Sequence, residues 1–169
     1  NQTYRPAQLT RLLERERAFF EHWTHDASII PVEYYPDWRH RFERDRAMLL
    51  KRWRKARHEG FEEIFDEILA KIGRNGPTMA RDIGSQRKTG RGWWDWHPEK
   101  TALEFHWRTG NLAISGRDGF QKIYDLAENV IPSTSLSERA EEGAFVDWAC
   151  RSALKRLGFA TSGEIAAFW

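Results

Sequence analysis

The feature that most constrains this chain is a tight turn set between two alternating runs of apolar residues. Residues 112–126 read LAISGRDGFQKIYDL, and Asp118-Gly119 lies near the centre of this stretch. An Asp-Gly pair tolerates the positive φ angles of a short hairpin turn, and alternation places one face of each strand against a core. The sequence therefore predicts a β-hairpin over residues 112–126.

Two helical patterns and a turn precede this hairpin. Residues 61–73 (FEEIFDEILAKIG) are amphipathic, with apolar residues recurring three and four positions apart. Asn75-Gly76-Pro77 marks a turn, and Thr78 is a suitable N-cap for a short helix over residues 78–83. This segment therefore predicts a helix, a turn and a second helix.

A third helix is predicted over residues 97–110 (HPEKTALEFHWRTG), between a basic, glycine-containing loop and the hairpin. Pro98 stands in its first turn, where a missing amide hydrogen costs little, and Gly110 ends it. Helix, turn, helix, loop, helix and hairpin in this order predict a winged helix over residues 60–132. In that fold, one helix can enter the major groove of DNA.

The first 59 residues predict two helices separated by a connector. Apolar residues at helical spacing run from residue 6 to about residue 25, and prolines break the pattern in IIPVEYYP, residues 29–36. The second helix, over residues 37–58, carries nine basic side chains against two acidic ones between Arg39 and Arg57. Residues 1–59 are thus expected to form a helical connector with a basic helix.

After the predicted hairpin, residues 133–137 form a polar linker that leads into an amphipathic helix. LGFATSGEIAAFW, residues 157–169, then repeats the helix end, turn and short helix of residues 72–83. The sequence therefore predicts a mainly α fold with small β-hairpins (α+β), in which tandem winged helices are joined and the second, residues 133–169, is incomplete. Because the chain begins without methionine and ends within an apolar pattern, we expect an internal piece of a longer protein.

Charge and cysteine content restrict the class of protein. The 27 basic and 25 acidic residues give a formal net charge of +2, so the clustering of charges has to indicate a partner. The single cysteine excludes an intrachain disulfide and a cysteine-cluster zinc site. No apolar run approaches the roughly 20 residues that span a bilayer. We expect a cytoplasmic, nucleoid-associated monomer that needs no cofactor.

Basic residues cluster at places from which they can reach a DNA backbone: the basic helix, the loop before the third helix, the start of that helix, and the hairpin turn. The candidates are Arg39, Arg46, Lys51, Arg54, Arg87, Lys88, Arg91, Lys100, Arg117 and Lys122. Each cation that neutralises a phosphate releases a counterion, which predicts salt-dependent binding to double-stranded DNA with little sequence specificity. A solvated helix face and a surface loop are the alternatives.

The aromatic residues and histidines near these cations have two interpretations each. Trp93, Trp94 and Trp96 follow the basic loop directly, but such rings are more often core anchors than stacking platforms for bases. His22 and His25 have a spacing that two ligands of a metal ion can show, although no third ligand is evident. Structural hydrogen bonds are the alternative role for this pair, and we predict no metal site.

Four blocks of the sequence together resemble the YcaQ/AlkZ-type winged-helix DNA glycosylases. They are FFEHWTHDASIIPVEYYPDWRHRFE, GPTMARDI, RGWWDWHPEKTALEFHWRTGNLAISGRDGFQKIYDL and VIP. The resemblance implies tandem winged helices, in agreement with the order of elements. It also implies hydrolysis of the N-glycosidic bond of N7-alkylated purines and the unhooking of interstrand crosslinks. Through the HWTHDAS block, it makes His25 a weak candidate near the active site.

The chain departs from that family in the catalytic motif, which is a glutamine, an apolar residue, and then glutamine or aspartate. Gln8-Leu9 is followed by Thr10, and no other glutamine of the sequence begins such a triplet. We therefore carry over no catalytic residue. The favoured hypothesis is the DNA-binding portion of a DNA glycosylase. The alternatives are a non-catalytic winged-helix DNA-binding module or regulator, and a helical protein-interaction domain with solvated basic faces.

Overall fold

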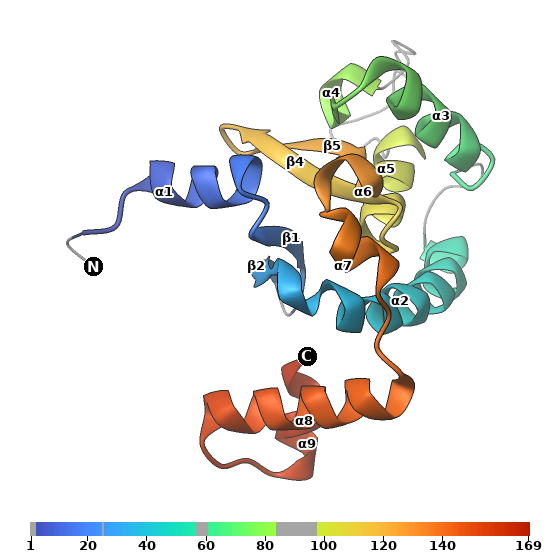
Figure 1. The fold of residues 1–169 in the computed structure, drawn as a ribbon. Coiled ribbons are helices and arrows are strands. Elements are labelled where there is room, and N and C mark those ends of the chain that lie inside the picture. The colour runs from blue at the N-terminus through green and yellow to red at the C-terminus, as the bar shows by residue number, and fades with distance from the viewer. Residues whose placement is uncertain (1–2, 25, 57–60, 84–97) are drawn as a thin grey trace.

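The computed structural model describes residues 3–24, 26–56, 61–83 and 98–169, and Figure 1 shows their arrangement. Within these ranges, helices surround small antiparallel sheets, which confirms the predicted mainly α, α+β class. The elements in chain order are α1 (Pro6–Thr10), a π-helical turn (Arg11–Arg15), β1 (Phe19–Trp23), β2 (Ala27–Pro31), a 3-10 turn (Val32–Tyr34), α2 (Tyr35–Ala56), α3 (Phe65–Asn75), β3 (Thr78–Met79), α4 (Ala80–Ile83), α5 (Pro98–Arg108), β4 (Leu112–Asp118), β5 (Gln121–Leu126), α6 (Ala127–Val130), α7 (Ser133–Ser137), α8 (Glu142–Leu157) and α9 (Ser162–Phe168).

The predicted hairpin over residues 112–126 is confirmed as β4 and β5. Asp118 pairs with Gln121, so the two residues of the turn are Gly119 and Phe120, one position later than the Asp-Gly pair. Gly119 has a φ of +58°, which a glycine adopts without steric cost at the first position of a hairpin turn. A register shift between Ile114 and Gly116 marks a bulge in β4, and bulges increase the local twist of a strand.

The order of elements predicted before the hairpin is also present, with two changes. The first helix, α3, begins at Phe65, four residues after its predicted start at residue 61, and the second helix lacks its first two predicted residues. Thr78 and Met79 form β3 instead of the first turn of a helix, and β3 pairs with β5 to give a sheet of order β3-β5-β4. The short helix that follows, α4, is limited to Ala80–Ile83. The apolar face of the sheet and the helices α3 and α5 enclose one core, which includes Ile72, Leu103, Trp107, Leu112 and Tyr124.

The helix predicted from residue 6 to residue 25 is wrong beyond its first part. Helical structure ends at Arg15, Arg17 has a φ of +52°, and the chain continues as the β1–β2 hairpin, in which Phe20 pairs with Ile30. Aromatic residues favour strands, and β1 is buried at its three central positions, residues 20–22. Burial beside α2 and β4 therefore decided the conformation of a segment whose apolar spacing also suits a helix.

The basic helix predicted over residues 37–58 is confirmed as α2, which begins two residues earlier, at Tyr35. Its apolar stripe includes Trp38, Phe42, Leu49 and Trp53, all of which are buried. Of the helices within the described ranges, none combines the length and the apolar character needed to cross a membrane.

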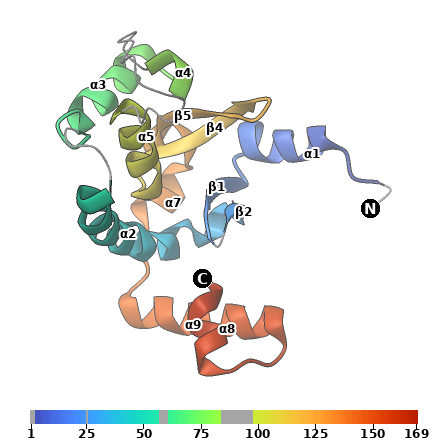
Figure 2. The ribbon, with the colours of Figure 1, turned by 180° about the vertical axis from the view of Figure 1, so that it is seen from behind.

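The C-terminal helices α8 and α9 lie on the side of α2 opposite to the β4–β5 sheet, as both ribbon views show (Figures 1 and 2). Residues 133–137, predicted as a linker, instead form the short helix α7, and its Leu136 packs against the core that contains Trp38. The predicted helix, turn and short helix of the C-terminal segment are confirmed. Thr161 caps α9 and accepts a hydrogen bond from the Glu164 amide, while the Glu164 carboxylate accepts one from the Thr161 amide.

Candidate nucleic-acid interface

Several of the candidate residues fall outside the described ranges. These are the loop cations Arg87, Lys88 and Arg91, and the histidine His25. The three tryptophans that follow the loop, at positions 93, 94 and 96, also lie outside these ranges. Within the described ranges, the candidate cations lie on α2, α5 and the β4–β5 hairpin.

The two cations of the hairpin meet a buried carboxylate of β1. Glu21 is only 5% exposed, and both Arg117 and Lys122 reach it. Arg117 Nε donates to Glu21 Oε2 at 2.9 Å, while Lys122 Nζ lies 3.6 Å from Oε1. The hydrogen bonds with Glu21 raise the pKa of Arg117, whereas burial lowers the pKa of Lys122. The structure thus brings the two predicted residues together, on a partner that the sequence analysis did not identify.

Lys122 also lies over an aromatic ring. Its Nζ is 3.3 Å from the centroid of the Trp107 ring, a position in which the ring quadrupole attracts the ammonium group. Trp107 is held in turn, because its Nε1 donates to the backbone carbonyl of Glu21 at 3.0 Å. Glu21, Trp107 and Lys122 therefore form one packed junction between β1, α5 and β5.

A cavity of about 280 Å³ opens beside this junction. It is lined by Trp23, Ala80, Lys100, Glu104, Trp107, Phe120, Gln121, Lys122 and Tyr124. Burial raises the pKa of the Tyr124 phenol, so this hydroxyl stays protonated and can donate a hydrogen bond. Lys100, in the first turn of α5, is exposed. The cavity thus combines aromatic walls with cations, the two kinds of group that contact bases and phosphates.

Two of the α2 candidates make their hydrogen bonds within the protein. Arg39 donates to the carbonyl oxygens of Leu136 and Glu138 and so holds the segment that follows α7. Arg54 makes a bidentate pair with Glu62, at 2.7 and 2.8 Å. Both guanidinium groups have a structural role in this conformation, and a phosphate would have to compete with these partners.

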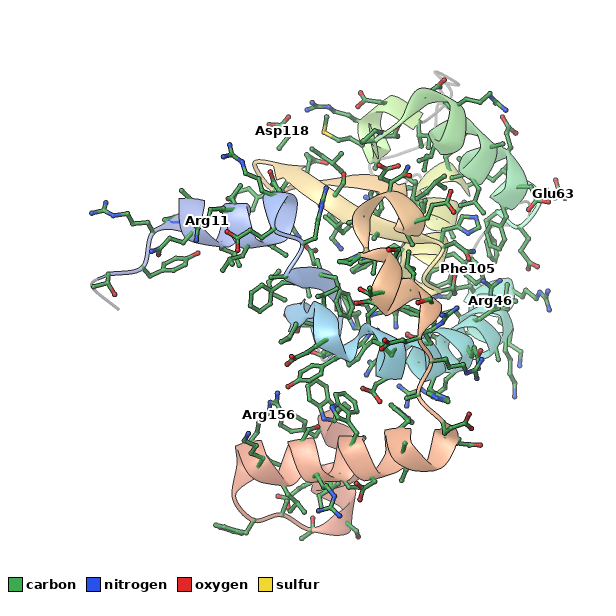
Figure 3. All side chains as sticks on the ribbon, viewed as in Figure 1. Arg11, Arg46, Glu63, Phe105, Asp118 and Arg156 are labelled. Atoms are coloured by element: carbon green, nitrogen blue, oxygen red, sulfur yellow. The ribbon has the colours of Figure 1, made fainter. Side chains whose placement is uncertain are left out.

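Arg46 occupies an intermediate position. It lies 5.7 Å over the Phe105 ring, the two residues being labelled in Figure 3. It also donates a long hydrogen bond of 3.4 Å to Asn111 Oδ1. Neither contact neutralises the charge of the guanidinium group, so Arg46 remains able to attract an anion.

The C-terminal half of α2 presents a group of exposed cations, which we call the basic end of α2. It consists of Lys51, Arg52 and Lys55, which are exposed and make no ion pair within the described residues. Lys51 was among the predicted DNA contacts, whereas Arg52 and Lys55 were not singled out. Their signal in the sequence was the density of cations in this helix.

One face of α2 buries an excess of positive charge. Asp45 is 1% exposed and pairs with Arg108 at 3.2 Å, and burial lowers the pKa of the neighbouring Arg41 to about 10. Arg41 Nε and Nη1 and Arg108 Nε are buried without a hydrogen-bond partner in the described part of the chain. Each guanidinium lies over an indole ring, Arg41 over Trp38 and Arg108 over Trp23. These contacts stabilise the cations only in part, so Asp45 is the carboxylate on which the cluster depends.

His22 has the structural role that the sequence left open. Trp38 Nε1 donates to His22 Nδ1 at 2.9 Å, and the Trp107 carbonyl oxygen lies 3.3 Å from Nε2. This geometry places the ring hydrogen on Nε2, and burial lowers the pKa of His22 to about 3, so the imidazole is neutral. Within the described ranges, no group of three or more His, Cys, Asp or Glu side chains could hold a metal ion.

A second cavity, of about 390 Å³, lies between α2 and the C-terminal helices. Aromatic residues form much of its wall, namely Trp38, Phe145, Trp148 and Trp169, and Arg41 and Arg44 line it from α2. Its rings pack on one another, with Trp148 stacked on Trp169 at a centroid distance of 5.2 Å. No local sequence pattern predicts this cavity, because its walls come from segments more than 100 positions apart.

The chain matches a known protein family. The sequence profile of a family described as DNA glycosylase AlkZ-like matches residues 1–169, which is the full length of the chain. No solved structure matches the chain.

Proposed function

The chain belongs to the AlkZ-like DNA glycosylase family, and we propose that it is the DNA-binding portion of an enzyme that removes N7-alkylated purines. DNA is the partner that this family implies. We further propose that the unit from α3 to β5 is a winged helix within residues 60–132, and that residues 133–169 begin another. We also propose that the protein is a monomer, that it acts on double-stranded DNA, and that it is located in the cytoplasm at the nucleoid.

The chemistry of the proposed reaction needs few protein groups. An N7-alkylated purine already has a positive charge, so the base is a good leaving group when its N-glycosidic bond breaks. The remaining tasks are to position a water molecule and to stabilise an oxocarbenium-like sugar, as carboxylates do in glycosidases. The same bond cleavage would unhook an interstrand crosslink that is attached through purine N7. We assign none of these tasks to a residue of this chain.

The observation that supports DNA binding most directly is the basic end of α2. Lys51, Arg52 and Lys55 are exposed and unpaired within the described ranges, whereas Arg117 and Lys122 already share the Glu21 carboxylate. Exposed cations without a protein partner can neutralise phosphates at no cost in broken ion pairs. We therefore propose that the basic end of α2, together with Arg46 and Lys100, makes the principal backbone contacts.

This proposal is tested by the salt dependence of binding. Fluorescence anisotropy with several unrelated duplexes should give similar affinities that fall steeply as salt rises. In the triple variant Lys51→Ala, Arg52→Ala, Lys55→Ala, the slope of log K against log salt should become less negative. The expected change is about 0.9 for each lost phosphate contact, or up to about 2.7 for three. Arg151→Ala is the matched control, because this exposed arginine of α8 pairs with Asp147 at 2.7 Å. Absence of wild-type binding at low salt would refute the proposal.

The non-catalytic module is the second candidate, favoured by the missing Gln-apolar-Gln/Asp triplet. The two candidates differ in whether the purified chain releases 7-methylguanine from methylated duplex DNA. We expect the chain to bind this duplex without releasing the base. Release would show that a group other than the family triplet performs the hydrolysis.

A further inference from the structure

We propose that Phe120, at the tip of the β4–β5 hairpin, is a wedge that enters the minor groove and inserts between stacked base pairs. This inference rests on the proposed DNA binding and adds to it a mode of contact that distorts the duplex. Minor-groove proteins often insert an apolar side chain between base steps, which unstacks them and kinks the helix.

Phe120 is 96% exposed, the highest value among the large apolar side chains of the described residues. A single exposed apolar residue is common on protein surfaces and indicates little by itself. Phe120, however, occupies the second position of a two-residue turn, where a polar residue would serve the hairpin equally well. The fold therefore gains nothing evident from the aromatic ring at this position.

Several interactions anchor the backbone of the hairpin tip that carries Phe120. The ladder between β4 and β5 continues to the Asp118–Gln121 pair, directly before the turn. Arg117 Nη1 donates to the Phe120 carbonyl oxygen at 3.0 Å, while the same guanidinium is bound by the buried Glu21 carboxylate. A second ion pair joins Asp118, labelled at the hairpin end in Figure 3, to Arg81 of α4 at 3.0 Å.

This anchoring gives Arg117 a role different from the phosphate contact predicted from the sequence. Its guanidinium connects a buried carboxylate of β1 to the backbone of the residue that carries the exposed ring. A wedge must keep its position against the stacking energy of the bases, and a braced turn does so at a lower cost in entropy than a mobile loop. Arg117 and Glu21 are therefore positioning residues for Phe120.

The surroundings of Phe120 suit DNA better than an apolar protein partner. The ring borders the cavity of about 280 Å³ that Lys100, Gln121 and Lys122 also line. Trp23 and Trp107 belong to the same wall and offer further flat surfaces. Glu104 adds one carboxylate to the lining, against the two lysines. An exposed ring beside cations and other flat rings matches a polyanion with stacked bases, whereas a protein interface would require a contiguous apolar patch.

Phe159 provides a matched comparison within the same chain. It is 91% exposed and follows Gly158 in the turn between α8 and α9. Its backbone carbonyl has no side-chain hydrogen bond within the described residues, and the ring borders none of the cavities given above. We therefore assign no wedge function to Phe159, and its replacement serves as the control.

The experiment uses the full 169-residue chain and a duplex with 2-aminopurine opposite thymine, since unstacking raises the fluorescence of this base. Anisotropy on the same duplex measures binding independently. With all DNA bound, wild-type protein should raise the 2-aminopurine signal. Phe120→Ala should lose most of that rise and weaken binding roughly tenfold, the typical effect of losing one stacking contact. Phe120→Trp and Phe159→Ala should both retain the rise, and circular dichroism should show all variants folded.

The outcomes separate this inference from the proposed function. Absence of wild-type binding at low salt overturns both. Binding with no 2-aminopurine rise, or with the same rise for Phe120→Ala, overturns the wedge and leaves DNA binding intact. A rise that survives in Phe120→Trp but not in Phe120→Ala supports the wedge. Glu21→Gln should reduce the rise at saturating protein, because it releases the Arg117 brace, and an unchanged rise would remove the positioning role.

Discussion

Replacing Asp45 by asparagine should destabilise the protein far more than its small change in shape suggests. The carboxylate is 1% exposed, lies 3.2 Å from Arg108, and has Arg44 Nε at 4.0 Å. It also faces Arg41, whose pKa burial already lowers to about 10. Asparagine keeps the volume of the side chain but removes the negative charge. The variant would thus leave Arg41 and Arg108 buried together without a counter-charge.

The expected loss follows from the cost of an uncompensated buried charge. Removing one partner of a buried ion pair typically costs about 3–5 kcal/mol, and three of the nitrogens of this cluster already lack hydrogen-bond partners within the described part of the chain. We expect Asp45→Asn to lower the free energy of unfolding by about 3 kcal/mol, a large share of the roughly 5–15 kcal/mol typical of a domain. With a urea m-value of about 2 kcal/mol per M, the midpoint of unfolding should fall by about 1.5 M.

The assay is urea unfolding followed by circular dichroism at pH 7, with Glu43→Gln as the matched control. Glu43 lies two positions earlier on the same helix and pairs with Arg139 at 2.6 Å, but its side chain is 58% exposed. Exposed pairs contribute about 1 kcal/mol or less, so the control should shift the midpoint by less than about 0.5 M. Equal midpoint shifts for the two variants would refute the argument that burial sets the strength of the Asp45 cluster.

Two further predictions concern His22 and two glycines. Burial lowers the pKa of His22 from 6.5 to about 3 in the folded protein. Between these two pH values the imidazole binds a proton in the unfolded chain but stays neutral in the folded one. The stability of the folded protein therefore falls as the pH falls from 6.5 towards 3. His22→Gln should remove about 2 kcal/mol of that loss between pH 7 and pH 5 in urea titrations, and an unchanged pH dependence would contradict this. Gly76 and Gly110 have similar φ angles, +80° and +78°. A Cβ atom added at Gly110 would lie 2.5 Å from a Phe42 ring atom, whereas a Cβ atom added at Gly76 would have no described atom within 4 Å. In thermal unfolding, Gly76→Ala should therefore cost about 1 kcal/mol and Gly110→Ala a further 1–3 kcal/mol or so, and equal costs would be inconsistent with the close approach.

The parts of the fold that were predicted correctly are those whose signals are local. The signals for the hairpin turn near Gly119, for the basic helix α2 and for the short helix α9 each lie within a few residues of the structure they specify. The β1–β2 hairpin was missed because its conformation depends on distant contacts. His22 meets Trp107, which lies 85 positions later in the chain, and no local pattern reports such a contact.

The same distinction between local signals and distant contacts applies to the candidate nucleic-acid interface. Residue type and clustering indicated cations such as Lys51 and Arg117, but only the fold distinguishes an exposed lysine from an arginine bound to a buried carboxylate. Arg117 and Glu21 are 96 positions apart, and a glutamate between a phenylalanine and a histidine gives no sign that it is buried. Phe120 was visible as part of the turn, yet its significance depends on its exposure and its hydrogen bond to Arg117.

The buried bonds of β1 also determine which segments can be exchanged between relatives. His22 accepts a hydrogen bond from Trp38 of α2, and the Glu21 carbonyl accepts one from Trp107 of α5. In a chimera that took β1 from one parent and α5 from another, these hydrogen bonds would have to form between segments that evolved in different proteins. Recombination breakpoints should therefore keep residues 19–38 and 98–126 of one parent together. For the same reason α8 should stay with α9, because Trp169 Nε1 donates to Ser152 Oγ across the turn between these helices at 2.6 Å.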